Sequence, residues 1–413
     1  MSAPPTEEIP LPSDQLNNSP PPPHSDTRII VMFLSVQFIG FFLFDGLRTI
    51  FPLFLDMTIG LAEDQVVESW GLIYSFGVFV GFLTRMPMGV LADRYPRRVS
   101  LTIGIALGMS TVLSLLFIRD ILLLAVSFGL LRMGVHLFPL VAREGITEVG
   151  SKKHGRLNSL VFFAGNVGSI LGPVILALVF EMSLEAFVFS TLAILLVSHL
   201  TILLFLPKKS HRTKNQLLPL LVDSFREVYR FKTVLLIFLA SGFLIGVIFS
   251  IQVPYALYVL KLSSGEVGIV VGLVQFLNLV IVLVAGELID SLGSRVMLTS
   301  ALLLELIAAG LLIASPFSLF SFTLSQVLFQ GGISILINSG LTLFTLQAKK
   351  RTFSTVFGAI TSLFFLGSSI SPTASSQLYL VGPTFPFWLV VIIALALLPT
   401  LWLLVPPKKV IRG

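Results

Sequence analysis

Two short charged segments, Gly89-Val-Leu-Ala-Asp93-Arg94-Tyr-Pro-Arg97-Arg98 and Gly286-Glu-Leu-Ile-Asp290-Ser-Leu-Gly-Ser-Arg295, repeat the pattern G-x-x-x-D-x-x-x-x-R at an offset of 197 residues. Each segment lies where one long apolar run ends and the next begins. The repeat therefore predicts two charged hairpins at corresponding places in the two halves of a membrane protein.

The composition of the chain supports this prediction. With 55% hydrophobic and 12% charged residues, the chain has too few charges to cover a soluble globule. Its apolar runs match a hydrocarbon core about 30 Å thick, and they are continuous rather than alternating, which favours helices over a β-barrel. We predict an all-α membrane protein with twelve transmembrane helices in two pseudo-symmetric six-helix bundles. The expected spans are 29–54, 66–91, 98–118, 120–142, 156–180, 185–206, 233–259, 267–289, 296–315, 318–346, 354–380 and 384–406.

One long polar interruption divides the chain into six spans and six. It holds a basic run followed by a segment of mixed apolar and charged residues, a composition typical of an interfacial helix. The proline-rich, acidic start lacks the basic and apolar layout of a signal peptide. We expect a disordered cytoplasmic tail at 1–28, six-helix bundles at 29–206 and 233–406, a cytoplasmic linker with an interfacial helix at 207–232, and a cytoplasmic tail at 407–413.

The basic residues fall on alternate loops. Twenty-two of the 27 Lys and Arg residues lie on one side of the predicted spans, two lie on the other side and three lie inside spans. Positive charge gathers on cytoplasmic loops, so both termini are expected in the cytoplasm of a multi-pass protein, which we assign to the plasma membrane. This distribution explains the net charge of +6 without nucleic acid as a partner.

Two further pairs of segments repeat at nearly the same offset. Gly168-Ser-Ile-Leu-Gly172-Pro173 is echoed by Gly367-Ser-Ser-Ile-Ser371-Pro372 at 199 residues, and Arg132-Met-Gly134 by Gln330-Gly-Gly332 at 198. Parallel repeats of six helices, with a substrate site near the midplane between them, are typical of secondary transporters.

The two charged turns resemble motif A of the major facilitator superfamily, although Pro96 replaces the usual glycine of the first copy. The resemblance implies that Gly89 packs closely against the eleventh span, and that Asp93 caps that span near 354–357. By the repeat, Asp290 caps the fifth span near 158–159. These contacts would form a releasable conformational latch. Its expected residues are Gly89, Asp93, Arg94, Arg97, Arg98, Gly286, Asp290 and Arg295.

The fifth-span sequence from Gly168 to Pro173 resembles motif C of proton-driven exporters, but Leu176 and Ala177 stand where that motif closes with glycines. The resemblance implies a seam between the bundles formed by small residues and proline. The alternative is a kinked helix with close packing. The expected seam residues are Gly168, Gly172, Pro173, Gly367 and Pro372.

Ionisable residues inside spans are functional candidates because burying their charge in lipid is costly. Asp45 and Arg48 share one face of the first helix, and Arg132 resembles the motif B arginine of the family. We expect proton coupling by Asp45, Arg132 and His136, the alternatives being a static pair of Asp45 with Arg48 and a packing histidine. The expected substrate-binding residues are Gln37, Arg48, Gln252, Tyr255, Gln326, Gln330 and Asn338.

Several classes of function find no support in the chain. It has no cysteine, no nucleotide-binding phosphate loop and only five scattered histidines, so neither an enzyme nor a metal or other cofactor is expected. We expect a secondary active transporter that works by rocker-switch alternating access and exports small amphipathic compounds as a proton-coupled antiporter (multidrug or metabolite efflux). The alternative is proton-coupled carriage of a small organic anion. A transporter-like receptor is a more distant alternative. The expected partners are a small-molecule substrate, protons and the lipid bilayer, and a monomer is expected.

Overall fold

The computed structural model describes residues 23–148, 154–206, 231–347 and 353–405. This described part is almost wholly helical and contains no strand. It includes 11 helices that are long and apolar enough to cross a membrane. The prediction of an all-α membrane protein is therefore confirmed.

The first bundle supplies six spans. Helices α4 and α5 together form one of them, because Pro139 has no N–H group to bond the carbonyl of Val135 and the helix breaks at His136 between them. The elements are α1 (Pro23–Phe54) with its π-helical continuation η1 (Leu55–Ile59), α2 (Glu63–Arg94), α3 (Arg97–Phe117), α4 (Ile121–Val135), α5 (Leu137–Glu148), α6 (His154–Met182) and α7 (Leu184–Phe205).

The second bundle also supplies six spans. Its elements are α9 (Lys232–Pro254) with the π-helical continuation η3 (Tyr255–Val259), α10 (Ser264–Leu292), α11 (Ser294–Ala314), α12 (Leu319–Gln347), α13 (Phe353–Val381) and α14 (Phe385–Leu404). Helix α13, the eleventh expected span, is not among the 11 apolar helices. It is as long as its neighbours but less apolar, because it carries a run of buried serines that includes Ser368, Ser371, Ser375 and Ser376.

Two boundaries differ from the expectation. Helix α1 starts at Pro23, so 23–28 are helical rather than part of a disordered tail. The first span also continues through η1 to Ile59, beyond the expected end at 54, and Asp45 lies near the middle of the Ile30–Ile59 span. The expected interfacial helix of the linker, the N-terminal residues 1–22 and the tail 407–413 lie outside the described residues.

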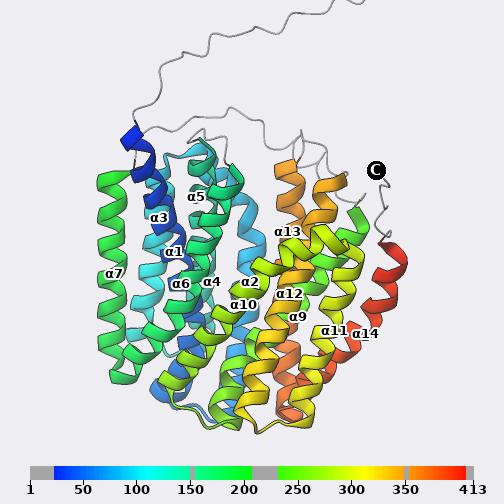
Figure 1. Ribbon diagram of the computed structural model, residues 1–413. Helices are drawn as coiled ribbons and strands as arrows, with labels where there is room; N and C mark the ends of the chain where they lie inside the picture. The colour runs from blue at the N-terminus through cyan, green and yellow to red at the C-terminus, as the bar shows by residue number, and fades with distance from the viewer. Residues whose placement is uncertain (1–22, 149–153, 207–230, 348–352, 406–413) are drawn as a thin grey trace, which may run out of the picture.

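The two bundles stand side by side in Figure 1, with α1 to α7 on the left and α9 and α11 to α14 on the right, while α10 runs diagonally across the middle. The start of α1 and the end of α14 lie at the same end of the molecule, at the top of Figure 1. We call this end the terminal face and the opposite end, where η1 leads into α2, the loop face.

Glycines of the predicted seam pack inside the bundles instead. A side chain on Gly168 or Gly172 of α6 would overlap the backbone of α1 at Phe38 or Phe42. In the second bundle, a side chain on Gly367 of α13 would overlap the backbone of α9 at Leu239. Small residues permit this close approach of helix backbones in membranes. The seam prediction is therefore wrong for these three glycines, which hold α1 to α6 and α9 to α13.

The seam between the bundles is formed by other residues. Three glycines of α10, Gly265, Gly268 and Gly272, pack against α6, where the carbonyl of Pro173 contacts Gly268. On the other side, Gly71 of α2 packs against Ser376 and the Pro372 carbonyl of α13. Both prolines thus lie at the seam as expected. The spacing of the α10 glycines, three and four residues apart, places them on one helix face and was the available signal.

Replacing Gly172 with Val should destabilise the first bundle, because the added side chain would force α6 away from α1. Overpacking of this kind costs about 1–3 kcal/mol. The measurement is the melting temperature of the purified protein in detergent. Gly310→Val in α11 is the matched control, since a Cβ there meets no atom of the described residues within 4 Å. An equal drop in both variants would contradict this account of α6.

Candidate functional site

A buried ion pair lies at mid-depth in the first bundle. Asp45 and Arg48 are one turn apart on α1, and the Asp45 Oδ1 to Arg48 Nε distance is 3.2 Å. The Ser169 hydroxyl of α6 donates a hydrogen bond of 2.6 Å to the other Asp45 oxygen. Only 3% of the Arg48 side chain and 8% of the Asp45 side chain are exposed, so both charges are withdrawn from solvent.

Arg48 also reaches the second bundle. Its Nη1 donates a long hydrogen bond of 3.5 Å to Oε1 of Gln252 on α9. Its guanidinium carbon lies 3.6 Å from the ring centre of Phe249, also on α9. This cation–π contact and the hydrogen bond make Arg48 a direct link between the bundles.

Arg132 of α4 forms a second cationic centre. Its Nη2 donates to the Tyr74 hydroxyl of α2 at 3.2 Å, and its guanidinium lies 3.9 Å from the ring centre of Phe44. Asp45 and Arg48 are within electrostatic reach, but Tyr74 supplies the hydrogen bond. Tyr74 was not among the residues expected at the site from the sequence.

His136 lies at the break between α4 and α5 and is 6% exposed. Its imidazole packs edge-on against Phe365 of α13, with 5.0 Å between ring centres, and against Gly81 of α2. His136 therefore contacts the second bundle through an aromatic ring. This environment is that of a packing histidine, and a proton-coupling role for it stays a prediction.

The cluster has more buried donors than acceptors. Arg48 Nη2, Arg132 Nε and Gln252 Nε2 are buried and find no hydrogen-bond acceptor among the described residues. The two guanidiniums also face a single carboxylate, that of Asp45. Unsatisfied buried donors are costly, and this set surrounds an excess of positive charge. The arrangement suits a ligand that brings acceptor oxygens and negative charge.

A groove of about 640 Å³ separates the bundles toward the terminal face. Its walls come from α1, α6, α10 and α12. Gln37, Asn338 and Thr342 supply polar groups, and Asp290 lies in the last turn of α10 at its edge. The remaining lining is apolar and includes Val161, Phe162, Phe163, Leu279 and Leu283. The groove thus brings together two of the predicted substrate-binding residues, Gln37 and Asn338.

Three other predicted binding residues lie elsewhere. The Tyr255 hydroxyl donates to the Pro316 carbonyl of its own bundle at 2.6 Å, and its ring stacks on Phe322. Tyr255 is therefore committed to packing at the loop face. Gln326 and Gln330 of α12 are buried, and neither lines the groove.

The expected latch stays a prediction, because the side chains of the helix starts that Asp93 and Asp290 were expected to cap lie outside the described residues. A Cβ on Gly89 or Gly286 would meet no atom of the described residues within 4 Å. Asp290 lines the groove together with Val161 of α6, the helix that it was expected to cap. The side chains of Asp93 and Arg94, and those of the helix starts at 154–159 and 353–359, lie outside the described residues.

Three arginines of these turns contact their own bundle. Arg97 lies over the Phe33 ring of α1 at 5.6 Å, and Arg98 Nε donates to the Leu206 carbonyl at the end of α7 at 2.5 Å. Arg295 lies over the Trp402 ring of α14 at 3.9 Å. These contacts anchor the terminal ends of the helices in each bundle.

Hydrogen bonds join the bundles at the loop face. The Tyr258 hydroxyl of η3 donates to Asp56 Oδ1 of η1 at 2.8 Å. Tyr379 and Gln377 of α13 donate to Glu63 and Glu68 of α2 at 3.3 and 3.4 Å, respectively. Three carboxylates of the first bundle thus each accept a hydrogen bond from the second, and the loop face is closed.

A family model described as "Major Facilitator Superfamily" matches residues 33–258 and 233–412, so it extends over most of the chain. The chain therefore belongs to the major facilitator superfamily. It is a transmembrane transporter, not an enzyme.

Solved structures of transporters share the fold at low sequence identity. A bacterial homolog of the human lysosomal transporter Spinster, inward-facing and unoccupied, is 14% identical with a TM-score of 0.75, covering 92% of this chain and 97% of its own. The nucleoside transporter NupG is 14% identical with a TM-score of 0.69, and the match covers 91% of this chain and 97% of NupG. A POT family transporter in complex with a thioalcohol-conjugated peptide is 13% identical with a TM-score of 0.68, and the match covers 90% of this chain and 96% of that transporter. No curated protein matches the chain by sequence.

Replacing Tyr258 with Phe should make the loop face open more often, because it removes the hydroxyl that donates to Asp56. Losing a hydrogen bond to a charged group costs about 1.5 kcal/mol or more, which is roughly tenfold in an equilibrium. The chain has no cysteine, so a cysteine introduced at the buried Ser250 of α9 is its only thiol. Labelling of this cysteine by a membrane-impermeant maleimide added at the loop face should be about tenfold faster in the Tyr258→Phe variant.

Tyr255→Phe is the matched control for this experiment. Tyr255 lies in the same π-helical segment as Tyr258, but its hydroxyl donates to Pro316 within the second bundle. Labelling should therefore stay near the rate of the unmodified transporter. If both variants label equally fast, the Tyr258 contact does not hold the loop face closed.

Proposed function

We propose that the protein is a proton-coupled carrier of small organic anions that works by rocker-switch alternating access. The observation that carries this proposal is the excess of buried donors and positive charge around Arg48 and Arg132. A carboxylate would accept hydrogen bonds from a planar guanidinium in a bidentate manner, which is the geometry that arginine favours. Phe44 and Phe249, which lie against the two arginines, offer apolar surface for the rest of the molecule.

Proton coupling follows from competition for Arg48. In the unoccupied site the guanidinium is paired with Asp45. A substrate anion that takes this guanidinium leaves the buried Asp45 carboxylate without its cation, and a buried unpaired charge is strongly unfavourable. Taking up a proton relieves that cost. Anion and proton would therefore bind together, and Ser169 would retain a hydrogen bond to the carboxyl group in either state.

Proton-coupled export of amphipathic compounds is the second candidate. The groove favours it, because a mostly apolar lining with Gln37, Asn338 and Asp290 suits a molecule with one polar end. The motif C resemblance gives weaker support for export, because its glycines Gly168 and Gly172 pack against α1 and not at the seam between the bundles. The buried site holds more positive than negative charge, and this favours the anion.

The closed loop face and the groove toward the terminal face support a state that is open on the terminal side. With the positive charge of the loops there, we propose that this side is cytoplasmic and that the protein lies in the plasma membrane as a monomer. Release of the loop-face contacts and closure of the groove, with Asp290 approaching the start of α6, would give the outward-facing state.

Replacing Arg132 with Gln should weaken anion binding at least thirtyfold, because losing one partner of a buried charged contact costs about 2 kcal/mol or more. The readout is a thermal-shift titration of the purified transporter at pH 5–8 with acetate, lactate and benzoate, since a bound ligand raises the melting temperature. The control is Arg119→Gln, because Arg119 lies over Phe54 at 5.2 Å outside this cluster. Unchanged anion stabilisation in Arg132→Gln would rule out the anion site.

Replacing Asp45 with Asn should abolish accumulation driven by a pH gradient while leaving substrate exchange, because the amide cannot take up a proton. Both are measured in proteoliposomes, by uptake against a gradient and by counterflow. The matched control is Asp120→Asn. Asp120 caps α4 through Leu123 N, a role that asparagine fills equally well. Accumulation at the full rate in Asp45→Asn would exclude Asp45 as the coupling residue.

A further inference from the structure

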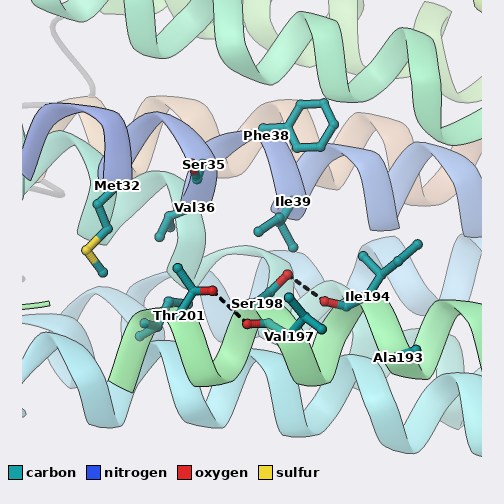
Figure 2. Close-up of a pocket in the computed structure, with 11 residues that line it drawn as sticks. Met32, Ser35, Val36, Phe38, Ile39, Ala193, Ile194, Val197, Ser198 and Thr201 are labelled. Carbon is teal, nitrogen blue, oxygen red and sulfur yellow. Dashed lines mark hydrogen bonds between the residues drawn. The ribbon is translucent and has the colours of Figure 1, made fainter. Parts of the chain in front are cut away.

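A second cavity lies between α1 and α7, within the first bundle and apart from the cluster around Arg48. Its volume is about 520 Å³ (Figure 2). On α1 it extends from Met32 to Ile39 and on α7 from Ala193 to Ile202, which corresponds to roughly 10–14 Å along the helices. Both stretches belong to the halves of these helices nearer the terminal face. The cavity is therefore an elongated groove inside the membrane layer.

The hydroxyl groups of the groove have no free hydrogen-bond donor for an occupant. Its hydroxyl groups are turned to their own helices, as Figure 2 shows for α7: Ser198 donates to the Ile194 carbonyl at 2.6 Å and Thr201 to the Val197 carbonyl at 2.8 Å. On α1, Ser35 donates to the Val31 carbonyl at 3.0 Å. The remaining walls are aliphatic or aromatic. A hydrocarbon chain suits such a groove, and a polar substrate does not.

Two arginines stand at the terminal ends of the helices that form the groove. Arg98 donates to the Leu206 carbonyl, one helical turn beyond Ile202, and is partly exposed. Arg97 lies over the ring of Phe33, the neighbour of Met32 on α1. Both residues belong to the charged turn that sequence analysis assigned to a latch, yet both contact the first bundle. Arg97 is buried, whereas the partly exposed Arg98 lies beyond the end of the apolar groove, a position that matches that of a lipid headgroup.

We propose that the α1–α7 groove binds one acyl chain of an anionic phospholipid whose phosphate contacts Arg98. The charge favours an anionic headgroup over a zwitterionic one, because a basic residue near the membrane surface contributes about 1 kcal/mol toward binding anionic lipid. The lipid would bridge α1 and α7 at the end of the bundle where the substrate groove opens. This site is independent of the proposed transport function and does not depend on which substrate is carried.

The test is native mass spectrometry of the purified transporter in detergent with added phosphatidylglycerol or phosphatidylcholine of the same acyl chains. We expect one phosphatidylglycerol to bind more tightly than phosphatidylcholine. Arg98→Gln should weaken phosphatidylglycerol binding about fivefold, the equivalent of about 1 kcal/mol, without changing phosphatidylcholine binding. Arg98→Lys should keep the preference, which separates loss of charge from misfolding. Equal affinity for the two lipids would overturn the proposal.

A second pair of variants tests the groove itself. Ala193→Phe fills it from α7 and should remove the tightly bound lipid. Leu196→Phe adds the same ring to the same helix outside the groove, where Leu196 is 49% exposed, and should leave lipid binding unchanged. Retention of the bound phosphatidylglycerol in Ala193→Phe would show that the acyl chain lies elsewhere.

Discussion

A guanidinium at mid-membrane needs acceptors that lipid cannot supply, and the arrangement of helices around Arg48 follows from this constraint. Asp45 supplies the counter-charge from the same face of α1, Ser169 fixes that carboxylate from α6, and Gln252 and Phe249 reach the guanidinium from α9. One side chain thus connects the pair of helices inside a bundle with the bundle opposite. In the proposed carrier mechanism, rocking of the bundles would change these contacts, so substrate binding and conformational change would be coupled through Arg48.

The close packing of α1 on α6 positions this pair. Because Gly172 has no side chain, the backbone of α1 at Phe42 can approach α6 closely, and Ser169 then comes within hydrogen-bonding distance of Asp45. The second bundle repeats the packing between α9 and α13 through Gly367. It does not repeat the charges, since no charged residue occurs between Lys232 and Lys261. The packing is therefore repeated, while the buried pair of Asp45 and Arg48 has no counterpart on α9.

The prediction of the fold from sequence was nearly complete, but that of the site was partial. The sequence placed Asp45, Arg48 and Arg132 inside the membrane, and the structure brings them into one cluster. It did not reveal Tyr74 as the partner of Arg132, because a tyrosine among many apolar residues of α2 carries no distinctive pattern. It also assigned Gly168 and Gly367 to the seam, because glycine spacing identifies a face for close packing and not the helix that fills it.

The sequence by itself determined the spans, the division into two halves and the side on which positive charge gathers, because the bilayer imposes length, hydrophobicity and charge limits that each segment must satisfy alone. The tertiary structure decided which side chains meet. Helices in lipid associate through the fit of their surfaces and the satisfaction of polar groups, and both depend on rotation and depth that local sequence does not specify. Arg98 shows the difference: its motif predicted a contact between the bundles, and its position in the folded chain places it at the end of α7.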